Sequence, residues 1–191
     1  MSLPDLAAVF AVLVVALIVC YIVLASYNAV VALRQRIDKA WANIGVVLKQ
    51  RHDQLPNLVS AVRGLMEYER DVLTRVTEAR AAYTPTAPIP DQAATSEATT
   101  AAVRSLFAVV ERYPDIKAAS NVQDLQDEIE RLEGMIADRR ELYNDQVYRY
   151  NTRIGQFPGA VLAPLFGWQT REFFVADATD AIRPDADLRS A

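Results

Sequence analysis

Few side chains in this sequence could carry metal, thiol or proton-transfer chemistry. The 191 residues include one cysteine, Cys20, and one histidine, His52. A zinc site needs several Cys, His or carboxylate ligands at close spacing, and a general-base histidine needs partners that orient it. A single residue of each type meets neither need. We interpret His52 as a solvated or capping residue and expect no metal site.

Other enzyme motifs are equally absent from the sequence. It has no glycine-rich phosphate loop, no G-x-S-x-G and no Glu-x-x-His pair of the kind that di-iron bundles use. The net charge of −4 argues against nucleic-acid binding, which needs a basic face. We therefore expect no catalytic residue, no cofactor and no small-molecule substrate, and an enzyme of unrecognised type is the least favoured interpretation.

Asparagine recurs in the segments that we predict to be helical, although its intrinsic helix propensity is poor. The positions are Asn28, Asn43, Asn57, Asn144 and Asn151. Several of these side chains are expected to point inward and form hydrogen bonds between helices, which would fix the register of packing. A functional polar pocket is the alternative.

Residues 6–25, LAAVFAVLVVALIVCYIVLA, contain no charge, no amide and no glycine. As a helix they would cover the roughly 30 Å hydrocarbon core of a bilayer, and they offer no polar face to water. The stretch predicts a transmembrane helix within residues 1–26, after a short outside tail. A cleaved secretory signal is the alternative, but the leader MSLPD lacks the basic residues of such signals. The predicted anchor includes Leu6, Phe10, Leu17, Cys20 and Leu24.

Charge on either side of this stretch predicts its orientation. Only Asp5 precedes it, whereas Arg34, Arg36 and Lys39 follow it. Because Lys and Arg are retained on the cytoplasmic side, we expect an outside N-terminus and a cytoplasmic body. The expected location is the plasma membrane, which in a bacterium is the inner membrane. Cys20 lies within the span and cannot form an intrachain disulfide, which fits a reducing compartment.

Residues 27–175 are predicted to be all-α, an antiparallel four-helix bundle with coiled-coil-like apolar stripes, because apolar residues recur at spacings of three and four. The stripe has a gap at residues 51–54, followed by Pro56. We favour a hairpin there, with one helix ending near Arg51 and the next capped by Asp53, so that Pro56 falls in a first turn. A single long kinked helix is the alternative.

The second predicted helix ends at Tyr83, before a proline-rich loop that extends to about Ser96. A third, weaker helix runs to Tyr113, and the clearest one runs over residues 121–157. Arg139 and Arg140 interrupt the apolar stripe of that last helix. Buried arginines need carboxylate partners. The expected partners are Glu67, Glu69 or Glu78 of the second helix.

The segment from Phe157 to Phe174 is rich in aromatic residues, and a disordered acidic tail is predicted over residues 176–191. If the rings are exposed, they form a surface for a protein partner or for lipid. The alternative is that the segment folds back and closes one end of the bundle. The candidate partner-binding residues are Phe166, Trp168, Phe173 and Phe174.

Several stretches together resemble the LemA family. They are SYNAVVALRQRIDKAWANIGVVLKQRHDQLPNLVSAVRG, VTEAR, YPDIKAASN, LQDEIERLE, YNDQVYRYNTRIGQFPGAVLAPLFGW and a closing FF, which run in that order from Tyr27 to Phe174. The resemblance implies one N-terminal membrane helix, an outside N-terminus and a cytoplasmic helical bundle. It also implies a link to magnetosome formation or membrane-protein quality control, and it assigns no catalytic residue.

These observations predict a non-catalytic scaffold or adaptor that is anchored in a membrane and acts in membrane-protein quality control or membrane organisation. Its expected partners are the bilayer and either other proteins or further copies of the chain. A lipid-contact or membrane-remodelling module is the alternative from a different class.

Overall fold

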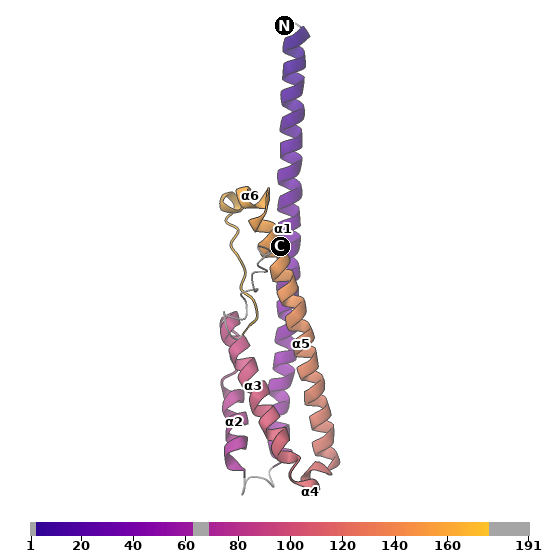
Figure 1. Cartoon of the computed structure of the whole chain (residues 1–191), viewed down its shortest axis with the longest axis vertical. Coiled ribbons are helices and arrows are strands. Elements are labelled where there is room, and N and C mark those ends of the chain that lie inside the picture. The colour runs from indigo at the N-terminus through magenta and orange to yellow at the C-terminus, as the bar shows by residue number, and fades with distance from the viewer. Residues whose placement is uncertain (1–2, 63–68, 176–191) are drawn as a thin grey trace, which may run out of the picture. The chain divides into compact units, whose positions relative to one another are not determined.

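The computed structural model of the chain describes residues 3–62 and 69–175. These residues form helices and no strand, which confirms the all-α prediction (Figure 1). The helices are α1 (Leu3–Ala61), α2 (Arg70–Ala81), α3 (Ile89–Val110), α4 (Pro114–Lys117), α5 (Ser120–Gly155) and α6 (Gly159–Phe166). The chain divides into two compact units, one of residues 1–39 with 145–171 and the other of residues 40–144 with 172–191. The predicted acidic tail, residues 176–191, lies outside the described residues.

Helix α1 continues through Pro56, so the predicted hairpin at residues 51–53 is wrong. Asp53 caps no helix there; its carboxylate instead accepts a hydrogen bond of 2.6 Å from Lys49, one turn earlier. A proline inside a helix costs about 3 kcal/mol. Burial of Leu55 and Leu58 on either side of Pro56 offsets that cost, because each leaves water almost completely.

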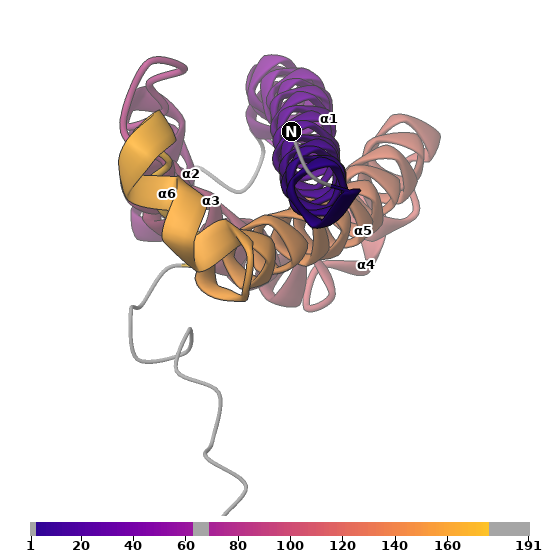
Figure 2. The same ribbon diagram turned by 90° about the horizontal axis from the view of Figure 1, so that it is seen from above.

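The core of the second unit draws buried residues from four helices, α1, α2, α3 and α5. Leu58 of α1, Val76 of α2, Leu106 of α3 and Ile129 of α5 belong to one apolar cluster and are at most 1 % exposed. Helices α2 and α3 run side by side in both views (Figures 1 and 2). The antiparallel four-helix bundle over residues 27–175 stays a prediction.

The predicted proline-rich loop is largely helical, because α3 begins at Ile89 and includes the Ser96 region. Pro88 stands at the N-cap and Pro90 in the first turn, where the missing N–H group costs nothing. Burial of Gln92, Ala93 and Ser96 stabilises this early part of α3. The sequence interpretation missed it because it treated each proline as a breaker.

The clearest predicted helix, residues 121–157, agrees with α5 to within two residues at each end. Asn121, the expected N-cap, lies one residue inside it. Pro114, expected only to end the preceding helix, begins the short helix α4. Helix α2 ends at Ala81, close to the predicted end at Tyr83.

Two glycines shape the short helix α6. A Cβ on Gly159 would lie 2.1 Å from the carbonyl oxygen of Arg153, so only glycine permits this close approach to the end of α5. Gly167 has φ of +64° and ends α6 in the left-handed conformation, with the Trp168 N–H donating to the Ala163 carbonyl at 2.9 Å. The second glycine thereby turns Trp168 back toward the helices.

Candidate functional site

Among the described residues, α1 is the helix long and apolar enough to cross a membrane. Its most apolar 18-residue window is exposed along its whole length, with no share buried against protein. The predicted anchor residues follow this pattern: Leu6, Phe10, Leu17, Cys20 and Leu24 are all exposed. The basic residues after the stretch, Arg34, Arg36 and Lys39, are exposed as well.

The four candidate aromatic residues divide between buried and exposed positions. Trp168 is buried in the first unit, with its ring 6.3 Å from Tyr27 and 5.2 Å from Phe166. Phe174 is buried in the second unit, 5.7 Å from the ring of Trp41. Phe173 is half-buried and Phe166 is 44 % exposed. Burial of Trp168 and Phe174 favours the alternative that the segment packs against its own chain, while binding of a partner stays a prediction.

The chain after α6 is held to α5 by asparagine and tyrosine side chains. In the first unit, the amide of Asn151 forms two hydrogen bonds of 2.9 Å with the backbone N–H and carbonyl of Arg171, and the Tyr150 hydroxyl donates to the Gln169 carbonyl. The side-chain amide of Asn151 thus satisfies both the N–H and the carbonyl of one residue, as a neighbouring strand would do in a sheet.

The same arrangement recurs seven residues earlier, within the second unit. The amide oxygen of Asn144 accepts from the Phe174 N–H at 2.8 Å, and the Tyr143 hydroxyl donates to the Glu172 carbonyl at 2.9 Å. The inward structural role predicted for the asparagines thus holds for Asn144 and Asn151. Their partner is an extended segment rather than a neighbouring helix.

Replacement of Asn151 by aspartate tests this attachment. The carboxylate keeps the acceptor for the Arg171 N–H but loses the donor to the Arg171 carbonyl, so we expect the free energy of unfolding to fall by about 1–2 kcal/mol. Denaturant unfolding of the full chain in detergent, followed by circular dichroism, measures the loss. The control is Asn57→Asp, since Asn57 is exposed and its amide donates a hydrogen bond to Gln54 of the same helix. Equal losses in both variants would show that Asn151 has no special role.

A buried arginine that the sequence interpretation missed lies at the centre of the second unit. Arg51 of α1 is 3 % exposed, and its Nη1 donates to Glu133 of α5 at 2.8 Å and to the Thr100 hydroxyl of α3 at 3.0 Å. Its Nη2 donates to the Ser96 hydroxyl at 2.9 Å. The supposed gap in the apolar stripe of α1 is therefore occupied by a charged side chain that connects three helices.

Arg140 of α5 pairs with Glu97 of α3, so its predicted pairing with the second helix is wrong. The buried Nε of Arg139 has no hydrogen-bond partner within residues 3–62 and 69–175. Of the expected carboxylate partners, Glu69 pairs with Arg112 and Glu67 lies outside the described residues. Together, Arg51, Ser96, Thr100 and Glu133 form the Arg51 cluster. Beside it, a cleft of about 380 Å³ between α3 and α5 is lined by residues of both charges, namely Glu97, Glu133, Arg104 and Arg140.

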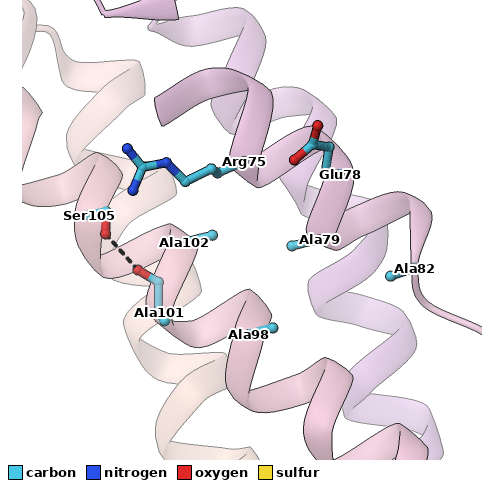
Figure 3. A pocket seen from close by; sticks show the side chains of 8 residues that line it. All are labelled: Arg75, Glu78, Ala79, Ala82, Ala98, Ala101, Ala102 and Ser105. Atoms are coloured by element: carbon cyan, nitrogen blue, oxygen red, sulfur yellow. Dashed lines mark hydrogen bonds between the residues drawn. The ribbon is translucent and has the colours of Figure 1, made fainter. Parts of the chain in front are cut away.

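A second, larger groove of about 490 Å³ lies between α2 and α3 (Figure 3). Its lining residues are Arg75, Glu78, Ala79, Ala82, Ala98, Ala101, Ala102 and Ser105. In Figure 3 the side chains of Ala79 and Ala82 face those of Ala98 and Ala102 across the groove, with Arg75 and Glu78 on the α2 side. The Ser105 hydroxyl is not directed at the groove as a free donor, because it donates to the Ala101 carbonyl at 2.9 Å. Small side chains of this kind let the backbone of another helix approach closely.

His52 lies inside α1 and not in a turn, so its predicted place in a turn and its predicted capping role are wrong, and its side chain is half-buried. Its ring is 5.0 Å from that of Tyr83, and its buried Nδ1 has no hydrogen-bond partner in the part of the chain that the structure describes. Burial lowers the pKa of His52 below its ordinary 6.5, and the positive charge of Arg80 lowers it further. The same described residues hold no group of three His, Cys, Asp or Glu that could bind a metal ion.

This environment predicts a pH dependence of stability. Because the pKa of His52 is lower in the folded state, the unfolded state binds the proton first as the pH falls. The contribution of neutral His52 is therefore complete above pH 6.5 and is lost progressively below it. Denaturant unfolding at a series of pH values between roughly 5 and 8 should show this loss, and His52→Gln should reduce it. An unchanged slope in His52→Gln would assign the pH dependence to carboxylates.

The LemA family model matches residues 40–187, which is most of the chain. The chain belongs to the LemA family. The match includes the Arg51 cluster and the residues that line both grooves, and it extends over the aromatic segment.

Curated relatives of this LemA-family chain include magnetosome proteins. The chain is 36 % identical over 73 residues to magnetosome protein MamQ 2 of Paramagnetospirillum magneticum and 32 % identical over 73 residues to magnetosome protein MamQ of Magnetospirillum gryphiswaldense. Each alignment covers 38 % of this chain and 27 % of the relative. The chain therefore matches only about a quarter of the length of these relatives.

Proposed function

We propose that this LemA-family protein is a membrane-anchored adaptor: α1 crosses a bilayer, and the helical body holds a protein partner at the cytoplasmic membrane face. The observation that carries the proposal is the continuity of α1. One helix begins with an apolar stretch that is exposed on all sides and ends with residues that belong to the core of the second unit. A stretch of this composition is stable only when lipid or another apolar surface covers it.

The orientation follows from charge. Arg34, Arg36 and Lys39 are exposed immediately beyond the apolar stretch, and basic residues are retained on the cytoplasmic side. We assign the body to the cytoplasm on this basis. The relatives named as magnetosome proteins favour a role in membrane organisation.

The groove between α2 and α3 is the surface we assign to the protein partner. Ala82, Ala98 and Ala101 are exposed there and form an apolar floor, while Arg75 and Glu78 provide opposite charges at its edge. Such a surface suits one amphipathic helix of the partner, with its apolar face in the groove and charged residues toward the rim. The partner helix would thereby complete the packing of α2 and α3.

Site-specific photocrosslinking tests this assignment. A photoreactive amino acid replaces Ala101 in the full chain, in its own membrane, and the control replaces Gln123, an exposed residue of α5 that does not line the groove. We expect a discrete crosslinked protein at position 101 and none at position 123. Ala98→Arg should abolish that product, because the long charged side chain fills the groove, while leaving the melting temperature unchanged.

Products that are the same at both positions would contradict the assignment of this groove. A crosslinked product that consists of two copies of the chain would contradict a separate partner protein and would show that the groove binds a second copy of the chain. Absence of any product at either position, together with intact membrane insertion, would contradict the adaptor function itself.

A further inference from the structure

Helix α6 presents an apolar stripe to its surroundings. Val161 and Leu165 are four residues apart, so they share one face of α6, and they are 59 % and 74 % exposed. Phe157, in the turn that precedes α6, is 82 % exposed. Gly159 and Leu162, which point away from this face, are buried within the first unit. Residues 159–166 include no charged side chain. Rings and branched chains this exposed, on a helix without a charge, indicate an apolar medium or a partner on that side.

The position of α6 relative to α1, within the first unit, indicates that the apolar medium is the lipid bilayer. The ring of Phe166, at the end of α6, lies 5.2 Å from the ring of Tyr27 of α1. Tyr27 is two residues beyond Ala25, where the apolar stretch of α1 ends, and two residues advance a helix by about 3 Å. The end of α6 therefore lies at the level where α1 leaves the hydrocarbon core.

The orientation of α6 is also that expected of a helix at the membrane surface. α6 lies across the direction of α1 in Figure 1, and Figure 2, which looks along α1, shows α6 from its side. If α1 is close to the bilayer normal, α6 lies close to the bilayer plane. Helices that rest in the membrane interface adopt this orientation and bury one apolar face among the lipid chains.

The chemistry of the surrounding residues is also that of a membrane interface. Tyr27, Phe166 and Trp168 form one cluster of rings, with centroid separations between 5.2 and 6.3 Å. Tyrosine and tryptophan are enriched at the headgroup level of membrane proteins. Arg34 of α1 and Arg153 of α5 are exposed in the same unit and can attract anionic headgroups.

We propose that α6 is a second membrane element of this protein: an interfacial helix that inserts Val161 and Leu165, together with Phe157 of the preceding turn, into the cytoplasmic leaflet beside the α1 span. The inference rests on the proposed anchoring by α1. The protein would then have two binding surfaces: the groove between α2 and α3 for a protein, and α6 for lipid. The contact between Tyr27 and Phe166 holds the end of α6 beside the end of the membrane stretch, which favours lipid over a soluble partner as the occupant of this face.

Depth-dependent fluorescence quenching in proteoliposomes tests the proposal with the full chain. In a Cys20→Ala background, single cysteines at Val161 and Leu165 carry an environment-sensitive fluorophore, and the vesicles contain phosphatidylcholine with phosphatidylglycerol. Both residues are exposed, so the substitutions leave the packing of α6 intact. We expect several-fold stronger quenching by a nitroxide near the top of the lipid chains than by iodide in the buffer.

Two control positions make the outcomes distinct. A cysteine at Asp138, which is exposed on α5, should respond to iodide and not to the lipid nitroxide, and a cysteine at Leu17 should respond to a nitroxide deep in the bilayer. Iodide quenching at Val161 and Leu165, with Leu17 in lipid, would overturn the inference and leave the anchor standing. Iodide quenching at Leu17 would overturn the anchor as well. If neither iodide nor the lipid nitroxide quenches the fluorophore at Val161 or Leu165, this face of α6 contacts protein, which would overturn the proposed contact with lipid.

Discussion

Replacement of Leu132 by aspartate is expected to abolish cooperative unfolding of the helical body. Leu132 of α5 is 0 % exposed, and Ile136 one turn later is 6 % exposed. A carboxylate in that position loses its hydration without gaining a partner, at a cost of several kcal/mol, while the whole stability of a domain is about 5–15 kcal/mol. Ile136→Asp should act in the same direction.

Thermal unfolding of the full chain in detergent, followed by circular dichroism, measures this effect. Gln123→Asp is the matched control, because Gln123 is an exposed residue of the same helix. We expect a sharp transition in the control and a broad or absent one in Leu132→Asp. A sharp transition in both would mean that this face of α5 is not part of a core.

Removal of the Glu133 carboxylate is expected to have the second largest effect. Glu133→Ala leaves Arg51 charged and buried, with the Ser96 and Thr100 hydroxyls as its remaining side-chain partners. Loss of one member of a buried pair costs about 3–5 kcal/mol, and the lower end applies because the Glu133 side chain is 24 % exposed. The free energy of unfolding from denaturant titration gives the value.

A surface ion pair on the same helix provides the control. Glu128 pairs with Arg131 at 2.7 Å, with the two side chains 36 % and 55 % exposed. Water and salt screen an exposed pair of this kind, so Glu128→Ala should change the free energy of unfolding little. In a double-mutant cycle, Arg51→Met with Glu133→Leu should recover part of the lost stability. Equal effects of Glu128→Ala and Glu133→Ala would contradict the buried role of the Arg51 cluster.

The successful predictions of the fold came from patterns within single segments of the sequence. The uninterrupted apolar run before Tyr27 and the long three–four rhythm of α5 are each properties of a single segment, and both were predicted. The course of α1 through Pro56 was not, since it depends on the burial of Leu55 and Leu58 against other helices. Proline has a strong local preference, but the packing of the whole unit outweighs it here.

The sequence does indicate the position of the Arg51 cluster, but the residues that indicate it were interpreted as a gap in the apolar stripe. Arg51 lies three residues after Leu48 and four before Leu55, which places it on the buried face of α1. Ser96 and Thr100 are four apart and therefore share one face of α3. Which carboxylate completes the cluster depends on the alignment of α5 with α1, and no local pattern determines that alignment.

The extended segment after α6 was unpredictable for a related reason. The Tyr-Asn pairs at residues 143–144 and 150–151 repeat at a spacing of seven, and this repeat indicates one polar strip along α5. Nothing in residues 169–174 identifies them as its partner. Their backbone groups, not their side chains, form the hydrogen bonds. Contacts made by the backbone leave little trace in composition.

The most direct test of the anchored-adaptor proposal is the protease sensitivity of the body on the two sides of the membrane. A protease is added to intact cells, after removal of any outer barrier, and to inverted membrane vesicles, and the fragment that contains Trp168 is followed by antibody. The proposal predicts that the body survives in cells and is digested in inverted vesicles. Digestion of the body from outside the cell would contradict both the orientation of α1 and the cytoplasmic site of action.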